Sequence, residues 1–119
     1  MASTLERLKR RREFLRVAGA KKSAGTYGLV IQALKSHSSA TAIRIGFTAS
    51  KKVGNAVCRN RARRRLKELA GEIMSVHALS GYDYVIIARG TTPDRSFNAL
   101  RRDFEKALKR LNLWQETAP

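Results

Sequence analysis

The segment from Lys51 to Lys67 reads KKVGNAVCRNRARRRLK and decides the fold expected for this chain. An alternating stretch precedes it, Gly54 and Asn55 interrupt the alternation, and a helical periodicity begins at Ala56. Eight of its seventeen residues are Lys or Arg, and none is acidic. An amphipathic helix would hold this charge on one fixed surface, which predicts a phosphate backbone as the binding partner.

The helix predicted from Ala56 to Val76 carries two parallel stripes of side chains. The apolar stripe consists of Cys58, Ala62, Leu66, Leu69 and Ile73. The basic stripe consists of Arg59, Arg63 and Lys67, widened by Arg61, Arg64 and Arg65. A rigid row of guanidinium groups can meet successive phosphates, each through two parallel hydrogen bonds. A merely solvated helix face usually mixes both signs of charge, and this one does not.

Periodic patterns elsewhere predict two further helices and three strands in an α+β fold, one sheet with helices packed against it. The helices are expected at Arg12–Ala18 and from Phe97 to Leu111, and the strands at Tyr27–Leu34, Ile43–Ser50 and Asp83–Arg89. The first two strands are expected to pair as a hairpin. The third lacks alternation, which indicates burial on both faces. Loops are expected at Lys21–Thr26 and Ser36–Thr41, and a turn at Thr91–Asp94.

The chain as a whole is strongly basic, with a formal net charge of +16 from 25 basic and 9 acidic residues. Thirteen Lys and Arg, and no acidic residue, lie between Glu13 and Glu68. Such self-repulsion in a compact state indicates a polyanionic partner, and nucleic acid fits best. An anionic membrane is the main alternative, but a lipidation motif and an apolar anchoring face are missing.

Length and composition, 119 residues of which 43% are hydrophobic, suit a single domain over residues 1–119. Its ordered core is expected at about 12–112, between a flexible basic N-terminus and a short C-terminal tail. A single cysteine excludes an internal disulfide. No apolar run could span a bilayer and no secretory signal is evident, so a cytoplasmic protein is expected.

No set of side chains predicts catalysis by the protein itself. His37 and His77 lack partners at metal-ligand spacing, and Cys58 on the apolar stripe is expected to be a small buried hydrophobic residue. Four acidic residues in the second half of the chain are not expected to form the two-metal carboxylate cluster of a nuclease: Asp83, Asp94, Asp103 and Glu105. Asp94 or Ser96 is expected to cap the last helix.

The stretch KKVGNAV from Lys51 to Val57, followed by RNRARR from Arg59 to Arg64, resembles the signature of the bacterial ribonuclease P protein subunit. Phe14 and Val17, the strand RIGF from Arg44 to Phe47, and DYVIIAR from Asp83 to Arg89 also fit the order of that family. The resemblance covers roughly residues 5–111. It implies a single two-layer sandwich of order α-β-β-β-α-β-α with a left-handed βαβ crossover, where general topology rules favour the right-handed one.

The resemblance also implies a function. A protein of this family is the non-catalytic component of a ribonucleoprotein endonuclease, a hydrolase of the bacterial cytoplasm. Its partners are a large catalytic RNA and precursor tRNA, from which that RNA removes the 5′ leader using magnesium ions. No obligate protein partner is evident.

Two sets of residues follow from the resemblance. The set expected to bind the RNA subunit is Lys51, Lys52, Asn55, Arg59, Asn60, Arg61, Arg63, Arg64 and Lys67. The cleft expected to bind the leader comprises Phe14, Val30, Gln32, Thr48 and Ser50. No dedicated protein metal site is expected, although Asn60 could share a magnesium ion with RNA. Many relatives carry a further aromatic residue where this chain has Ala18, and some carry Tyr where it has Gln32.

Alternatives remain at this point. A ribosomal or other structural RNA-binding protein would share the charge and size. A sequence-specific DNA-binding protein is disfavoured, because no helix-turn-helix spacing appears and the Arg-rich helix lacks a base-reading face of Asn and Gln. Phe14 could be core or leader contact.

Overall fold

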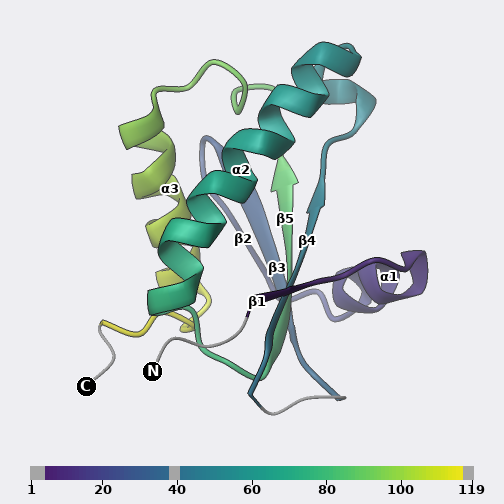
Figure 1. Ribbon diagram of the computed structural model, residues 1–119, viewed down its shortest axis with the longest axis vertical. Helices are drawn as coiled ribbons and strands as arrows, with labels where there is room; N and C mark the ends of the chain where they lie inside the picture. Colours follow the sequence, from purple (N-terminus) through teal and green to yellow (C-terminus); the bar gives the residue numbers. More distant parts are fainter. Residues whose placement is uncertain (1–4, 38–40, 117–119) are drawn as a thin grey trace.

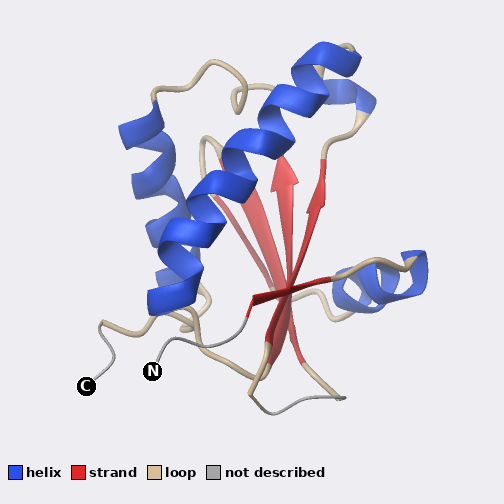
Figure 2. Ribbon diagram, in the orientation of Figure 1, coloured by secondary structure: helices blue, strands red, loops and turns tan. Residues whose placement is uncertain are grey.

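The computed structural model describes residues 5–37 and 41–116, which form a five-stranded sheet with helices on both faces (Figures 1 and 2). The elements in chain order are β1 (Leu5–Arg7), α1 (Arg11–Gly19), β2 (Ser23–Gly25), β3 (Leu29–Lys35), β4 (Ile43–Thr48), the 3-10 turn η1 (Lys51–Val53), α2 (Ala56–His77), β5 (Tyr82–Ala88) and α3 (Phe97–Arg110). The α+β class is confirmed, and the implied order is present with β1 added before it.

The strands lie in the order β1-β4-β5-β3-β2, so the predicted hairpin between the first two expected strands is wrong. The strand β5 lies between them, antiparallel to β3 and parallel to β4. Its run of apolar residues explains this position, because a central strand is buried on both faces. The helix α2 connects the parallel neighbours β4 and β5; the left-handed sense of that crossover stays a prediction.

Two short strands were not predicted from the sequence. The strand β1 falls in the expected mobile lead-in and pairs with β4, and β2 falls in an expected loop and pairs with β3. Leu8, which follows β1, is buried beside Val17 and Val85. At the other end, Leu113 is also buried. Of the predicted loop Ser36–Thr41, residues 38–40 lie outside the described residues.

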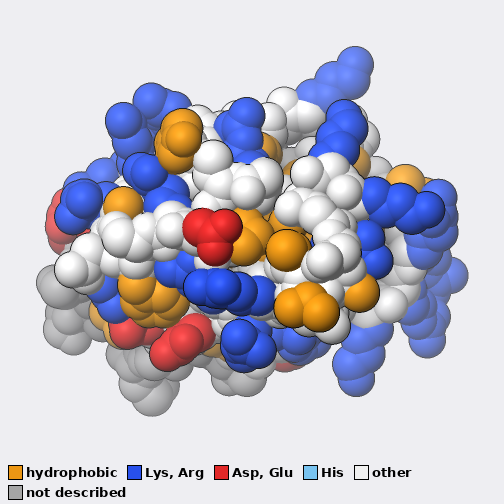
Figure 3. Space-filling view, turned by 90° about the horizontal axis from the view of Figure 1, so that it is seen from above, with side chains coloured by type: hydrophobic (Ala, Val, Ile, Leu, Met, Phe, Trp, Pro, Cys, Tyr) orange, Lys and Arg blue, Asp and Glu red, His pale blue; other side chains and the backbone are white. Residues whose placement is uncertain are grey.

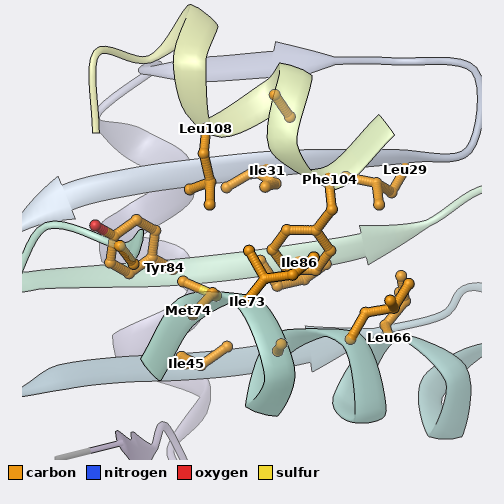
Figure 4. Packing of buried hydrophobic residues seen from close by; sticks show 14 of the residues in the cluster. Leu29, Ile31, Ile45, Leu66, Ile73, Met74, Tyr84, Ile86, Phe104 and Leu108 are labelled. Atoms are coloured by element: carbon orange, nitrogen blue, oxygen red, sulfur yellow. The ribbon is translucent and has the colours of Figure 1, made fainter. Parts of the chain in front are cut away.

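The main core lies between the sheet and the pair α2 and α3 (Figure 4). Ile31, Tyr84 and Ile86 project from the strands and meet Leu66 of α2 and Phe104 of α3. The predicted apolar stripe of α2 is confirmed for its four later members, which are buried. Cys58 is only half-buried, because it lies in the first turn of the helix, near the end of the core.

The helix limits agree with the local sequence. Asn55 caps α2 by accepting a hydrogen bond from the Cys58 amide at 2.9 Å, and Ser96 caps α3 by accepting one from Ala99 at 3.2 Å. Gly54 has a φ of +140°, which favours glycine at this entry to the helix. Within the described part of the chain, no helix has both the length and the apolar character needed to cross a bilayer.

Candidate nucleic-acid interface

The two lysines that precede α2 lie on the 3-10 turn η1 at the end of β4, and both are exposed. Ser50 caps this turn, since its hydroxyl accepts a hydrogen bond from the Lys52 amide. The turn therefore sets Lys51 and Lys52 beside the first turn of α2. Seen from this end of the molecule, Lys and Arg side chains crowd the rim and outnumber the acidic ones (Figure 3).

The basic face of α2 is partly organised by hydrogen bonds to nearby residues of the helix and of the turn before it. Arg59 donates a hydrogen bond to the Gly54 carbonyl at 3.2 Å, and Arg63 donates one to Asn60 Oδ1 at 2.5 Å. Arg64 and Lys67 are exposed. These short contacts use one donor of each guanidinium and leave others for a phosphate. The face therefore presents cations from four helix residues, Arg59, Arg63, Arg64 and Lys67.

The carboxylate of Asp94 pairs with one arginine of this face. Arg61 and Asp94 form an ion pair with 3.7 Å between Nη1 and Oδ1, and their side chains are 52% and 87% exposed. An exposed pair of this kind contributes little stability and is weakened by salt. A phosphate could replace Asp94 as the partner of Arg61 at small cost.

Arg65 does not belong to the basic face, contrary to the expectation from the sequence. Its guanidinium donates to the carbonyls of Thr92 at 2.8 Å, Pro93 at 2.6 Å and Arg95, and it lies over the Phe97 ring. Burial is the main cause that lowers the pKa of Arg65, followed by repulsion from Arg61. Arg65 therefore holds the β5–α3 loop against α2.

Asn60 does not fit a dedicated magnesium site. Its side-chain oxygen accepts a hydrogen bond from the cationic Arg63, which disfavours a metal ion at the same atom. In residues 5–37 and 41–116, no three His, Cys, Asp or Glu side chains are grouped so that they could hold a metal.

The predicted leader cleft lies on the opposite face of the sheet, where α1 covers only part of the strands. Val30 and Thr48 pair in register with Ile87, and Gln32 pairs with Val85. In-register neighbours share one face, and Val85 and Ile87 pack on the α1 side. Val30, Gln32 and Thr48 therefore lie together on this face and are half-buried. Ser50 is exposed beyond the end of β4.

Phe14 of α1 lies directly over Gly46 of β4. A Cβ atom at Gly46 would collide with the Phe14 ring, so this glycine is required for the close approach. The ring is half-buried and packs against the small cluster of Leu8, Val17 and Val85. Phe14 thus contributes to packing but is not fully buried, on the same face of the sheet as Gln32 and Thr48. Ala18, in the next turn of α1, is exposed.

A group of charged residues at one end of this face was missed by the sequence analysis. Asp83 is only 1% exposed, and its Oδ2 lies 3.2 Å from Arg16 Nη1 and 3.5 Å from Arg44 Nη1. Arg44 also pairs with Glu13. These contacts tie α1 to β4 and β5 and fix the position of Phe14. The signal in the sequence was a carboxylate next to a run of apolar strand residues.

Comparisons with known proteins agree with this arrangement. The family model described as Ribonuclease P matches residues 3–112. The ribonuclease P protein component of Paramagnetospirillum magneticum is 47% identical over 98% of this chain and 90% of that protein. The one from Caldanaerobacter subterraneus is 33% identical over 98% and 97%.

Solved structures give the same result. The ribonuclease P protein of Staphylococcus aureus superimposes with a TM-score of 0.77 and 26% identity, over 92% of this chain and 97% of that one. The protein from Thermotoga maritima gives a TM-score of 0.73 and 28% identity, over 88% and 96%. The basic helix, the partly open sheet face and these matches together show that the chain belongs to the ribonuclease P protein family, whose members are components of a ribonucleoprotein nuclease in tRNA processing.

Proposed function

We propose that this protein binds the catalytic RNA of ribonuclease P through η1 and the basic face of α2, and contacts the 5′ leader of precursor tRNA through the Phe14 side of the sheet. The observation that carries the proposal is the separation of these two surfaces. A surface of cations lies at the start of α2, and the half-buried, uncharged residues Phe14, Val30, Gln32 and Thr48 lie on the face that α1 partly covers.

The first surface would act by electrostatics. Lys51, Lys52 and the α2 arginines reduce the repulsion between the phosphates of the catalytic RNA and those of the substrate. Asn55 is committed to capping α2, so its part is to orient the helix, with its amide group left as a donor. Magnesium, which the RNA would hold, supplies the hydrolytic chemistry, and the protein serves as a cofactor in the bacterial cytoplasm.

The second surface would hold a single strand without reading its sequence closely. The Phe14 ring offers one stacking platform, and Gln32 and Thr48 offer hydrogen-bonding groups on the strands beside it. Stacking tolerates every base, because each base has an aromatic face. With Ala18 in the next turn and Gln32 on β3, this cleft has a single aromatic contact of this kind, so we expect weak discrimination among leaders.

Reconstitution tests the proposal. The purified protein is mixed with a bacterial ribonuclease P RNA and a 5′-extended precursor tRNA at low magnesium, beside reactions with RNA alone and protein alone. We expect the protein to restore leader removal that the RNA alone performs poorly, and to cleave nothing by itself. Binding to both RNAs without any promotion of cleavage would contradict the proposal and favour a structural RNA-binding protein.

A further inference from the structure

A basic hollow lies apart from both proposed surfaces, between the β2–β3 turn, the segment after β5 and one side of α3. Its volume is about 620 Å³, and we call it the Tyr27 hollow. Its walls include the residues Tyr27, Arg89, Arg95, Asp103, Lys106 and Arg110. The β5–α3 loop separates it from α2, since Arg65 binds carbonyls of that loop while Thr91 donates a hydrogen bond to the Tyr27 carbonyl at 2.5 Å.

The charge of the Tyr27 hollow is strongly positive. Four of its lining residues are Lys or Arg and one is Asp, which gives 4 − 1 = +3. Asp103 is already bound by Arg95 through two hydrogen bonds, so it does not neutralise the other three cations. Concave surfaces lined by one sign of charge concentrate the opposite ion.

Two of the cations are held in place by the backbone of the β2 end and turn. Arg89 Nη1 donates to the Thr26 carbonyl at 2.7 Å, and Arg110 Nη1 donates to the Gly25 carbonyl at 2.8 Å. A guanidinium has five N–H donors, so each arginine keeps donors for a ligand. Fixing the side chain beforehand lowers the entropy cost of binding an anion. Lys106, one helical turn before Arg110, is exposed.

Tyr27 supplies an aromatic surface at the same place. Its side chain is 66% exposed, and the Arg95 guanidinium lies 4.6 Å from the centre of its ring. The turn that carries it is packed tightly on α3, because a Cβ atom at Gly28 would collide with the side chains of Leu100 and Asp103. An exposed ring on a fixed turn beside several cations is a suitable platform for a nucleobase and its phosphate.

We propose that the Tyr27 hollow binds a nucleotide of single-stranded RNA, with the base on Tyr27 and the phosphate between Arg89, Lys106 and Arg110. This inference rests on the proposed function, because the RNA would belong to the ribonuclease P complex. The same chemistry could be offered by an unpaired segment of the catalytic RNA or by the precursor tRNA. The site is a contact additional to the α2 face and to the leader cleft.

The test uses two variants of the hollow and two matched controls. Tyr27→Ala removes the stacking surface, and Lys106→Gln removes one charge. Leu15→Ala is the control for loss of an exposed apolar side chain, which is 57% exposed on α1. Arg102→Gln removes an exposed charge from α3 outside the lining of the hollow. Thermal melting of each variant confirms that it folds.

Binding is measured with full-length protein in two arms, to the catalytic RNA alone and, as assembled holoenzyme, to precursor tRNA. We expect Tyr27→Ala to weaken binding in one arm by about 5- to 150-fold, the range of a lost base stack. Lys106→Gln should reduce the slope of log affinity against log salt by about 1 in that same arm, while Arg102→Gln leaves it unchanged. The affected arm identifies the source of the nucleotide.

A direct probe separates this inference from the proposed function. The free protein is titrated with a single-stranded uridine tetranucleotide, and the backbone amide signals of Gly25 and Tyr27 are followed by NMR. Shifts there that disappear in Lys106→Gln support the site even if reconstitution fails. If those signals stay unchanged and both variants bind both RNAs as their controls do, the site is overturned while the α2 assignment stands.

Discussion

Alternate residues of the same strands point to the two faces of the sheet, but helices cover the two faces to different extents. One face is closed by α2 and α3 over a continuous apolar core, and the other is partly covered by the nine-residue helix α1. Along β3, Ile31 is fully buried on the closed face, while its neighbours Val30 and Gln32 on the other face are half-buried. Residues on the fully covered face therefore contribute to stability, while residues on the partly covered face remain available for a ligand.

The closed face should lose most when a large side chain is removed. Phe104→Ala leaves a cavity between α3, α2 and the sheet, and we expect the free energy of unfolding to fall by about 3–5 kcal/mol. Urea denaturation measures this change. A fall of less than about 1 kcal/mol would mean that the core repacks around the site, and the contrast between the faces would be weaker than described.

The open face should lose function when its aromatic residue is removed. Phe14→Ala should weaken binding of leader-bearing precursor tRNA by roughly 1–3 kcal/mol, the range for one base stack, with little change for mature tRNA. Affinities of the holoenzyme for the two substrates provide the measurement. Equal losses for both substrates would make Phe14 a packing residue only.

Two neighbouring arginines of α2 separate support of the fold from display of charge. Arg65→Ala removes donors to three loop carbonyls, so we expect a loss of about 1–2 kcal/mol in the free energy of unfolding. Arg64→Ala, the exposed neighbour, should change it by less than about 0.5 kcal/mol. Comparable losses in chemical denaturation of the two variants would show that the β5–α3 loop does not depend on Arg65.

The smallest effect on stability is expected for Arg61→Ala. Its pair with Asp94 is exposed, so the melting temperature should stay close to that of the unmodified protein. Affinity for the catalytic RNA should nevertheless fall, with a salt slope reduced by about 1. A large drop in melting temperature together with unchanged RNA affinity would move Arg61 from the interface to the fold.

The parts that could be predicted from the sequence are those whose signals are local. The apolar stripe of α2, the break at Gly54 and Asn55, and the cap at Ser96 each depend on residues within a few positions. The strands β1 and β2 could not be predicted, because each has three residues and is defined by its pairing with a neighbour. Strand order failed for the same reason, since residues far apart in sequence decide it.

The candidate site shows the same division. Lys51 and Lys52 directly precede α2 on η1, and the position of the α2 arginines followed from spacing along that one helix. The separate role of Arg65 did not, because the carbonyls it binds lie 27 to 30 residues further along the chain. Around Asp83, the local pattern indicated only the carboxylate itself, because its partners Arg16 and Arg44 come from distant segments. The Tyr27 hollow also brings together residues from distant segments, so no local pattern indicates it.

The central position of β5 has a consequence for how the protein is made. Residues 82–88 emerge from the ribosome after β3, β4 and the whole of α2, yet they must insert between the two earlier strands. Until then, β3 and β4 have no shared neighbour, and the basic segment is synthesised without the strand that anchors it. Folding therefore depends on contacts between residues far apart in sequence, and such contacts form slowly. Until they form, a long cationic nascent chain is exposed to the surrounding RNA.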